Sequence, residues 1–150
     1  MSFEALKRDS DKRWLDLTTG TKPWIRVSSV MCCGTSLESE EIVSVIANYI
    51  EKNKMLINID TVGCHGICYA GPIIDILYKG QPRIFWGNVT KDNVVKILDS
   101  YIKKGEVLTD NLLGSLGARS IDGIKKIDDL PGINLQNRIA LRNSGNIAFN

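Results

Sequence analysis

Hydrophobic and polar positions alternate in four short segments of the chain and recur with a helical period in three others. The alternating and β-branched runs predict strands, at residues 24–30, 55–62, 73–78 and 83–86. The last two runs flank Lys79-Gly80-Gln81-Pro82, which predicts a β-hairpin. Apolar residues three and four apart predict helices, at residues 3–16, 35–52 and 90–104. The second helix can begin with a capping box formed by Thr35 and Glu38. The third helix can begin at Thr90 as its N-cap and end at Gly105.

Between residues 24 and 105 the expected order is strand, helix, strand, loop, two strands and a helix. A strand–helix–strand unit forms a right-handed parallel crossover in nearly all sheets, whereas a hairpin is antiparallel. We therefore expect an α/β fold in which helices flank one mixed sheet. This element order is that of the thioredoxin-like fold.

Residues 106–150 carry glycines and a proline at short intervals, which interrupt regular elements. Only Arg138–Arg142 has the pattern of a strand. We expect an extended tail that needs a partner to bury its apolar residues, and a disordered tail is the alternative. The chain then divides into an N-terminal helix with a linker (1–23), an α/β domain (24–105) and a connector or docking tail (106–150).

Charge and composition exclude several classes of protein. The 19 basic and 17 acidic residues are evenly spread, and the absence of a basic stripe argues against a nucleic-acid binder. No run of about 18 apolar residues occurs, so we expect no membrane span. The first residues have no apolar region of an export signal. We therefore expect a cytoplasmic protein, in which structural disulfides are rare.

Four cysteines form two tight pairs that follow predicted strands: Cys32, Cys33, Cys64 and Cys68. Parallel neighbouring strands end at the same edge of a sheet, so we expect the pairs to face one another. Tetrahedral sulfur sites suit zinc or iron–sulfur clusters, and zinc motifs usually have C-x2-C spacing, which is absent here. The pattern favours a [2Fe–2S] cluster held by all four thiolates. Burial as small apolar residues is the alternative.

The loop at residues 63–72 (GCHGICYAGP) is rich in glycine. Gly63, Gly66 and Gly71 can bring backbone N–H groups close to sulfur atoms, which an anionic cluster needs. His65 lies between the two cysteines and is the only histidine of the chain. Rieske-type ligation needs two histidines, so we expect His65 to have a surface or supporting role.

This loop and the segment Trp86–Thr90 (WGNVT) resemble the second cysteine loop and the following segment of thioredoxin-like [2Fe–2S] ferredoxin domains. Such domains occur in the flavoprotein and small diaphorase subunits of complex I relatives and of NAD(P)-linked hydrogenases. Residues 109–150 are similar to the connector after this domain in the NADH-binding flavoprotein subunit, and Arg138–Gly145 (RIALRNSG) to the start of its FMN/NADH domain.

The resemblance implies an electron-transfer or docking subunit of a cytoplasmic NAD(P)H-linked multisubunit oxidoreductase, such as a hydrogenase or an electron-bifurcating enzyme. The implied partners are a flavin/NADH-binding subunit and other iron–sulfur subunits. The chain has no Gly-rich phosphate loop and no later cysteine motif, and it stops where the flavin domain would begin. We therefore expect no FMN or NAD site and no catalysis by this chain alone.

The first cysteine motif departs from the family pattern. Relatives usually have C-x4-C, whereas Leu37 stands here at the second ligand position, and Ser144 replaces a cysteine that is usual in the tail. Either Cys33 replaces the missing ligand, or the domain is a cluster-free structural module that anchors a flavoprotein. A thiol–disulfide enzyme is a minor alternative, because no C-x-x-C motif is present.

Overall fold

The computed structural model describes residues 2–28, 36–117 and 121–139. The helices are α1 (Phe3–Thr19), α2 (Ser36–Lys52) and α3 (Val94–Leu98), and α3 continues into a π-helical turn, η3 (Asp99–Lys103). The strands are β1 (Trp24–Ser28), β2 (Asn58–Val62), β3 (Ile74–Leu77), β4 (Arg83–Trp86) and β5 (Leu112–Leu116). Two 3₁₀ turns are η2 (Cys68–Ala70) and η4 (Ile127–Asp129).

The strands form one mixed sheet in the order β2-β1-β3-β4-β5. β1 and β2 are parallel, and α2 connects them, so the predicted crossover is confirmed. The predicted hairpin is the antiparallel pair β3–β4, and β1–β3 and β4–β5 are also antiparallel. The α/β class with helices flanking a mixed sheet is thereby confirmed.

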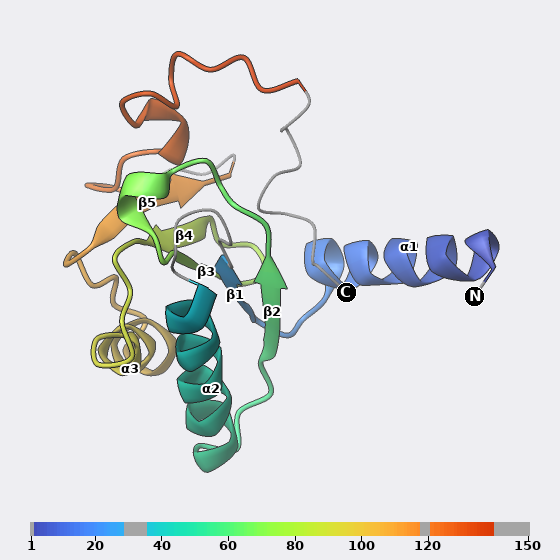
Figure 1. Cartoon of the computed structure of the whole chain (residues 1–150). Helices are drawn as coiled ribbons and strands as arrows, with labels where there is room; N and C mark the ends of the chain where they lie inside the picture. The colour runs from blue at the N-terminus through green and yellow to red at the C-terminus, as the bar shows by residue number, and fades with distance from the viewer. Residues whose placement is uncertain (1, 29–35, 118–120, 140–150) are drawn as a thin grey trace.

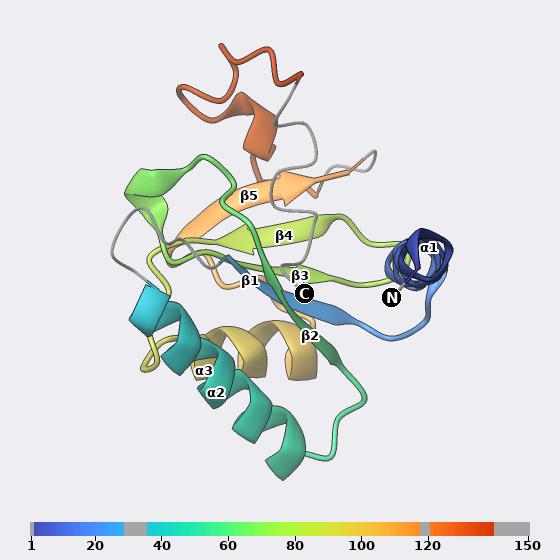
Figure 2. The ribbon, with the colours of Figure 1, turned by 45° about the vertical axis from the view of Figure 1, so that its right-hand side comes forward.

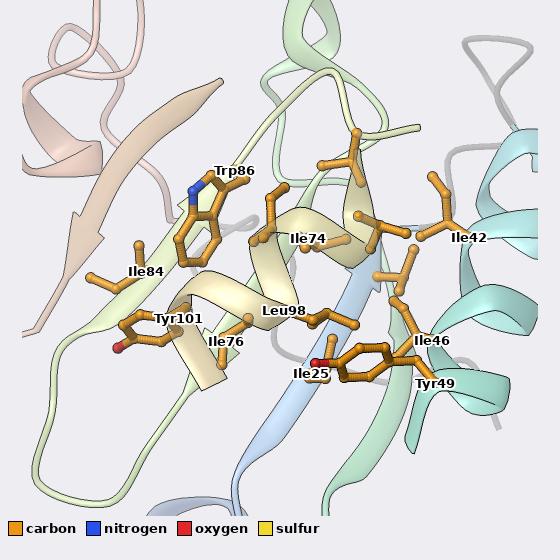
Figure 3. Close-up of a cluster of buried hydrophobic side chains, with 14 residues drawn as sticks. Ile25, Ile42, Ile46, Tyr49, Ile74, Ile76, Ile84, Trp86, Leu98 and Tyr101 are labelled. Atoms are coloured by element: carbon orange, nitrogen blue, oxygen red, sulfur yellow. The ribbon is translucent and has the colours of Figure 1, made fainter. Parts of the chain in front are cut away.

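α2 and α3 cover one face of the sheet (Figure 2). Every second residue of each central strand points to that face, as the pleat of a strand requires, and packs against both helices (Figure 3). The labelled core residues are Ile25, Ile42, Ile46, Tyr49, Ile74, Ile76, Ile84, Trp86, Leu98 and Tyr101. Burial of each such side chain contributes about 1.5–3 kcal/mol, so this layer is the main source of stability.

The opposite face of the sheet is covered by the cysteine loop and by part of the C-terminal tail. A second apolar cluster consists of Ile67, Ala70, Ile73, Phe85, Ile127 and Ile133. The prediction that the tail needs a partner to bury its apolar groups is therefore wrong for Ile127 and Ile133. They pack on the cysteine loop of their own chain, because β4 offers Phe85 on that face.

β5 is a second correction to the predicted tail. Residues 112–116 (LLGSL) lack a clear strand pattern, yet they pair with β4 and extend the sheet past Gly105. An unpaired edge of β4 accepts them, so tertiary pairing overrides weak local preference. The strand predicted at Arg138–Arg142 is absent at Arg138 and Ile139, and the rest of it lies outside the described residues. The division of the chain into three domains stays a prediction.

The ends of several elements differ from expectation. The second strand begins at Asn58 instead of Met55, and the described part of the first ends at Ser28. The predicted cap at Thr35 lies outside the described residues. The last helix begins at Val94 with Asn93 as its N-cap, four residues later than predicted, and Thr90 instead closes the turn that leads into it. The Thr90 carbonyl oxygen accepts from the Val94 N–H at 3.0 Å and its hydroxyl from the Asn93 N–H at 3.2 Å.

The N-terminal helix is confirmed and extends to Thr19. Figure 1 shows α1 reaching away from the sheet, and none of its residues is buried. Its large apolar side chains Phe3, Leu6 and Trp14 are more than half exposed. No helix in the described segments is long and apolar enough to cross a membrane.

Candidate metal centre

Of the four predicted cysteine ligands, the structure describes the second pair, Cys64 and Cys68. Cys64 follows β2 by two residues and is half-buried, whereas Cys68 begins η2 and is exposed. Cys32 and Cys33 lie outside the described residues, so the predicted facing of the two pairs stays a prediction. Leu37, which takes the second ligand position of the family pattern, lies in the first turn of α2.

Two backbone hydrogen bonds hold the cysteine loop on the turn after β4. The Asn88 N–H donates to the carbonyl of Ala70 at 2.7 Å, and the Val89 N–H donates to that of Pro72 at 3.0 Å. A Cβ atom on Gly87 would lie 2.8 Å from the Ala70 oxygen, so this close approach requires glycine. The WGNVT segment is therefore the support of the cysteine loop.

One of the three loop glycines donates a backbone hydrogen bond to a cysteine sulfur, as predicted. The Gly66 N–H donates to Cys64 Sγ at 3.1 Å, and Gly66 adopts a φ of 77°, which favours glycine. Gly71 differs, because its N–H donates to the Cys68 carbonyl oxygen at 3.4 Å. For Gly63 the described residues show no bond to sulfur. A backbone N–H aimed at a thiolate stabilises negative charge on that sulfur.

Sequence reasoning missed a buried charge network beneath the loop. Asp75 on β3 is fully buried and accepts from Arg26 Nε at 3.0 Å, from Arg83 Nε at 2.6 Å and from Arg83 Nη2 at 2.8 Å. Arg26 and Asp75 are register partners in the β1–β3 pair, on the face away from the helices. The sequence did contain an indication of this network, namely one Arg and one Asp in otherwise apolar strands. Charged residues that are buried are nearly always paired with an opposite charge.

His65 joins this network from the cysteine loop. Its Nε2 lies 3.2 Å from Arg83 Nη2, and its ring meets the Phe85 ring edge-on at a centroid distance of 5.4 Å. The residue is only 7% exposed, so the expectation of a surface role is wrong and that of a supporting role stays open. Burial lowers the pKa of His65 to about 4, against the attraction of Asp75.

The carboxylate remains ionised in this network. Burial alone would raise the pKa of Asp75, but the charges of Arg83 and Arg26 outweigh burial and hold that pKa below its ordinary value. Two arginines and one carboxylate leave a net positive charge under the loop. Arg138 adds a further positive charge close to the loop. Its Nη2 atom would lie 3.0 Å from a Cβ atom built on Gly66. The surroundings therefore favour an anion on the loop.

The donor set fits an iron–sulfur cluster. Such a cluster with four thiolates is an anion that needs N–H donors on its sulfur atoms, and the loop supplies a half-buried thiol with a donor already in place. Within the described residues no group of three or more His, Cys, Asp or Glu side chains is placed to hold a metal ion.

Comparisons with known proteins agree with this assignment. No family model matches the chain. A 2Fe-2S ferredoxin from Clostridium pasteurianum is 35% identical over 75 residues, which are 49% of this chain and 71% of the ferredoxin. A thioredoxin-like [2Fe-2S] ferredoxin from Aquifex aeolicus superposes with a TM-score of 0.55 at 18% identity, over 67% of this chain and 97% of that one.

A further structure of the wild-type Aquifex ferredoxin gives a TM-score of 0.52 at 20% identity, over 61% of this chain and 96% of that chain. These solved structures establish the thioredoxin-like fold, and the clostridial relative establishes the family. The chain therefore belongs to the [2Fe–2S] ferredoxin family and has a thioredoxin-like fold.

Proposed function

We propose that this chain is an electron carrier that holds a [2Fe–2S] cluster with Cys32, Cys33, Cys64 and Cys68. The observation that carries the proposal is the Gly66 N–H donated to Cys64 Sγ at 3.1 Å, in a chain of the ferredoxin family. When bound, the cluster supplies one-electron transfer. Cys68 lies at the exposed side of the loop, where a redox partner can approach.

Several described residues serve this role. The Gly66 N–H lowers the cost of negative charge on Cys64, and the turn at Gly87–Val89 keeps the loop in place. The Arg26–Asp75–Arg83 group lies beneath the loop and adds net positive charge there, because two guanidinium groups face one carboxylate. Together they favour a bound anion over empty thiols.

We further propose that the carrier works within an NAD(P)H-linked oxidoreductase complex, beside a flavin/NADH-binding subunit and other iron–sulfur subunits. The support is the likeness of residues 109–150 to a flavoprotein connector. Under this proposal NADH alone does not bleach the visible band of the chain, and a flavin-containing partner with NADH does. Direct reduction by NADH would contradict it.

A cluster-free anchoring module is the second candidate, favoured by one observation. Leu37 is part of α2, where relatives place a ligand, so the first motif lacks its usual second thiol. Under this candidate the protein folds without iron, and Cys64→Ser leaves both the assembly and the activity of the complex unchanged. Under the electron-carrier proposal Cys64→Ser still assembles but the complex loses activity, and that result would contradict the anchoring module.

The test is anaerobic purification followed by iron and acid-labile sulfide assays and a visible spectrum. We expect about two irons and two sulfides per chain, a bleachable charge-transfer band, and loss of both in Cys64→Ser and Cys68→Ser. Cys33→Ser should also lose the cluster. If Cys33 replaces the thiol missing at position 37, the double variant Cys33→Ser with Leu37→Cys should regain it. Colourless, iron-free, folded wild-type protein would overturn the proposal.

A further inference from the structure

His65 is the one side chain of the cysteine loop that reaches into the buried charge network. The residue is 7% exposed, and the Phe85 and Arg83 side chains from β4 contact its ring. The ring is therefore fixed in one orientation. The proposed function makes no use of this buried and oriented imidazole.

The contact with Arg83 determines which ring nitrogen carries the proton. A guanidinium can only donate hydrogen bonds, so His65 Nε2, at 3.2 Å from Arg83 Nη2, is the acceptor. Asp75 Oδ2 lies 3.7 Å from the same nitrogen, which is too long for a hydrogen bond. Nε2 is thus unprotonated, and the proton of the neutral ring is on Nδ1.

Nδ1 is a buried donor that has no hydrogen-bond partner within the described part of the chain. Native proteins supply nearly every buried donor with an acceptor. In an imidazole Nδ1 is the nitrogen nearer the main chain, so this donor lies closer to the backbone of the cysteine loop than Nε2 does, and Nε2 contacts Arg83. The acceptor is therefore expected on the loop or on the group that the loop binds.

We infer that the Nδ1–H group of His65 donates a hydrogen bond to a sulfur atom of the iron–sulfur group on the cysteine loop. His65 is then a positioning residue that tunes the reduction potential, and Arg83 fixes its tautomer. The inference rests on the proposed function. A hydrogen bond to sulfur stabilises the extra negative charge of the reduced state, so it raises the potential.

The test is the midpoint potential of the full-length, iron-loaded protein, measured by a redox titration followed by electron paramagnetic resonance. His65→Phe keeps a ring beside Phe85 but removes the donor, and its potential should fall below that of the wild type. His65→Asn places an amide donor near the Nδ1 position and should recover part of the shift. Tyr69→Phe, at a 67% exposed residue of the same loop, is the control and should leave the potential unchanged.

A potential of His65→Phe equal to that of the wild type overturns the inference. If this variant does not accumulate as folded protein, the wild type still provides the test, because His65 is the only histidine. Labelling with ¹⁵N-histidine should give one ¹⁵N coupling to the reduced iron–sulfur group, and nitrogen NMR should show the Nδ1–H tautomer. Absence of the coupling, or an Nε2–H tautomer, overturns the inference.

The two proposals fail in different ways. Wild-type protein that binds neither iron nor sulfide overturns both the electron-carrier function and the role of His65. Protein that binds iron and sulfide, but shows neither the ¹⁵N coupling nor a potential shift in His65→Phe, overturns the role of His65 alone.

Discussion

At the scale of single residues, one carboxylate organises the chemistry under the cysteine loop. Asp75 accepts from Arg26 and from Arg83, and Arg83 in turn donates to His65. Truncating one member of a buried ion pair leaves an uncompensated charge, which costs about 3–5 kcal/mol. The network that holds His65 of the cysteine loop therefore depends on a carboxylate of β3, outside that loop.

Gly66 is the position in the loop where the backbone conformation most strongly requires glycine. Its φ of 77° is left-handed, which costs a residue with a Cβ about 1–2 kcal/mol. An added Cβ would also meet Arg138 Nη2 at 3.0 Å. We expect Gly66→Ala to lower the free energy of unfolding by about 1–2 kcal/mol, measured by urea unfolding of the purified protein.

Gly63→Ala is the matched control for this prediction. Gly63 lies in the same loop, has no left-handed φ, and nothing lies within 4 Å of its added Cβ. Its substitution should change the free energy of unfolding by less than about 0.5 kcal/mol. Equal losses in the two variants would show that the loop conformation of Gly66 is not the cause.

At the scale of elements, the tail beyond β5 is part of the folded unit. η4 and the turn after it place Ile127 and Ile133 against Ile67 and Phe85, so the tail and the cysteine loop stabilise each other. The same arrangement brings Arg138 over Gly66. A change in the tail is therefore expected to reach the loop.

Ile133→Ala tests this packing. Ile133 is 8% exposed, and truncating a buried isoleucine costs about 2–5 kcal/mol, so a loss near the lower end of that range is expected. Leu135→Ala is the control, because Leu135 is 86% exposed. This substitution should lower the free energy of unfolding by no more than about 0.5 kcal/mol. Thermal or urea unfolding compares the two. A loss as small for Ile133 as for Leu135 would contradict the packing of the tail.

At the scale of the whole molecule, α1 is nearly independent of the sheet. Among the described contacts, its one salt bridge to the sheet joins Arg13 Nη2 to Asp60 Oδ1 at 2.6 Å, and none of its side chains is buried. The Arg13 side chain is 42% exposed and that of Asp60 9%, so solvent screens the pair from the Arg13 side and its contribution is small, about 0–1 kcal/mol. The stability of the domain therefore comes from the sheet and its two covering layers.

Deletion of residues 2–20 tests this independence. The free energy of unfolding should change by no more than about 1 kcal/mol, the upper value for a surface ion pair. Arg13→Ala should reproduce the whole of that small change, and hydrogen exchange should be fast throughout α1. A loss of several kcal/mol on deletion would reveal packing of α1 on the sheet that the structure does not contain.

The local pattern was sufficient for most of the fold. Period-two runs at β1, β3 and β4 and the helical period of α2 are properties of adjacent residues, so the crossover and the hairpin followed from them. The weak strand β5 did not follow, because its pairing depends on the open edge of β4 and not on its own residues.

The site was predictable in its residue types but not in its surroundings. Cysteine spacing and a glycine-rich loop indicated sulfur ligation, and the Gly66 N–H on Cys64 Sγ agrees with it. The sequence by itself determined the elements, the cysteine loop and the likeness to ferredoxins. Only the tertiary structure decided that Asp75, Arg83 and His65 share one buried network and that the tail covers the loop. Those contacts join residues 8 or more positions apart, and their strength comes from exclusion of water, which no local pattern records.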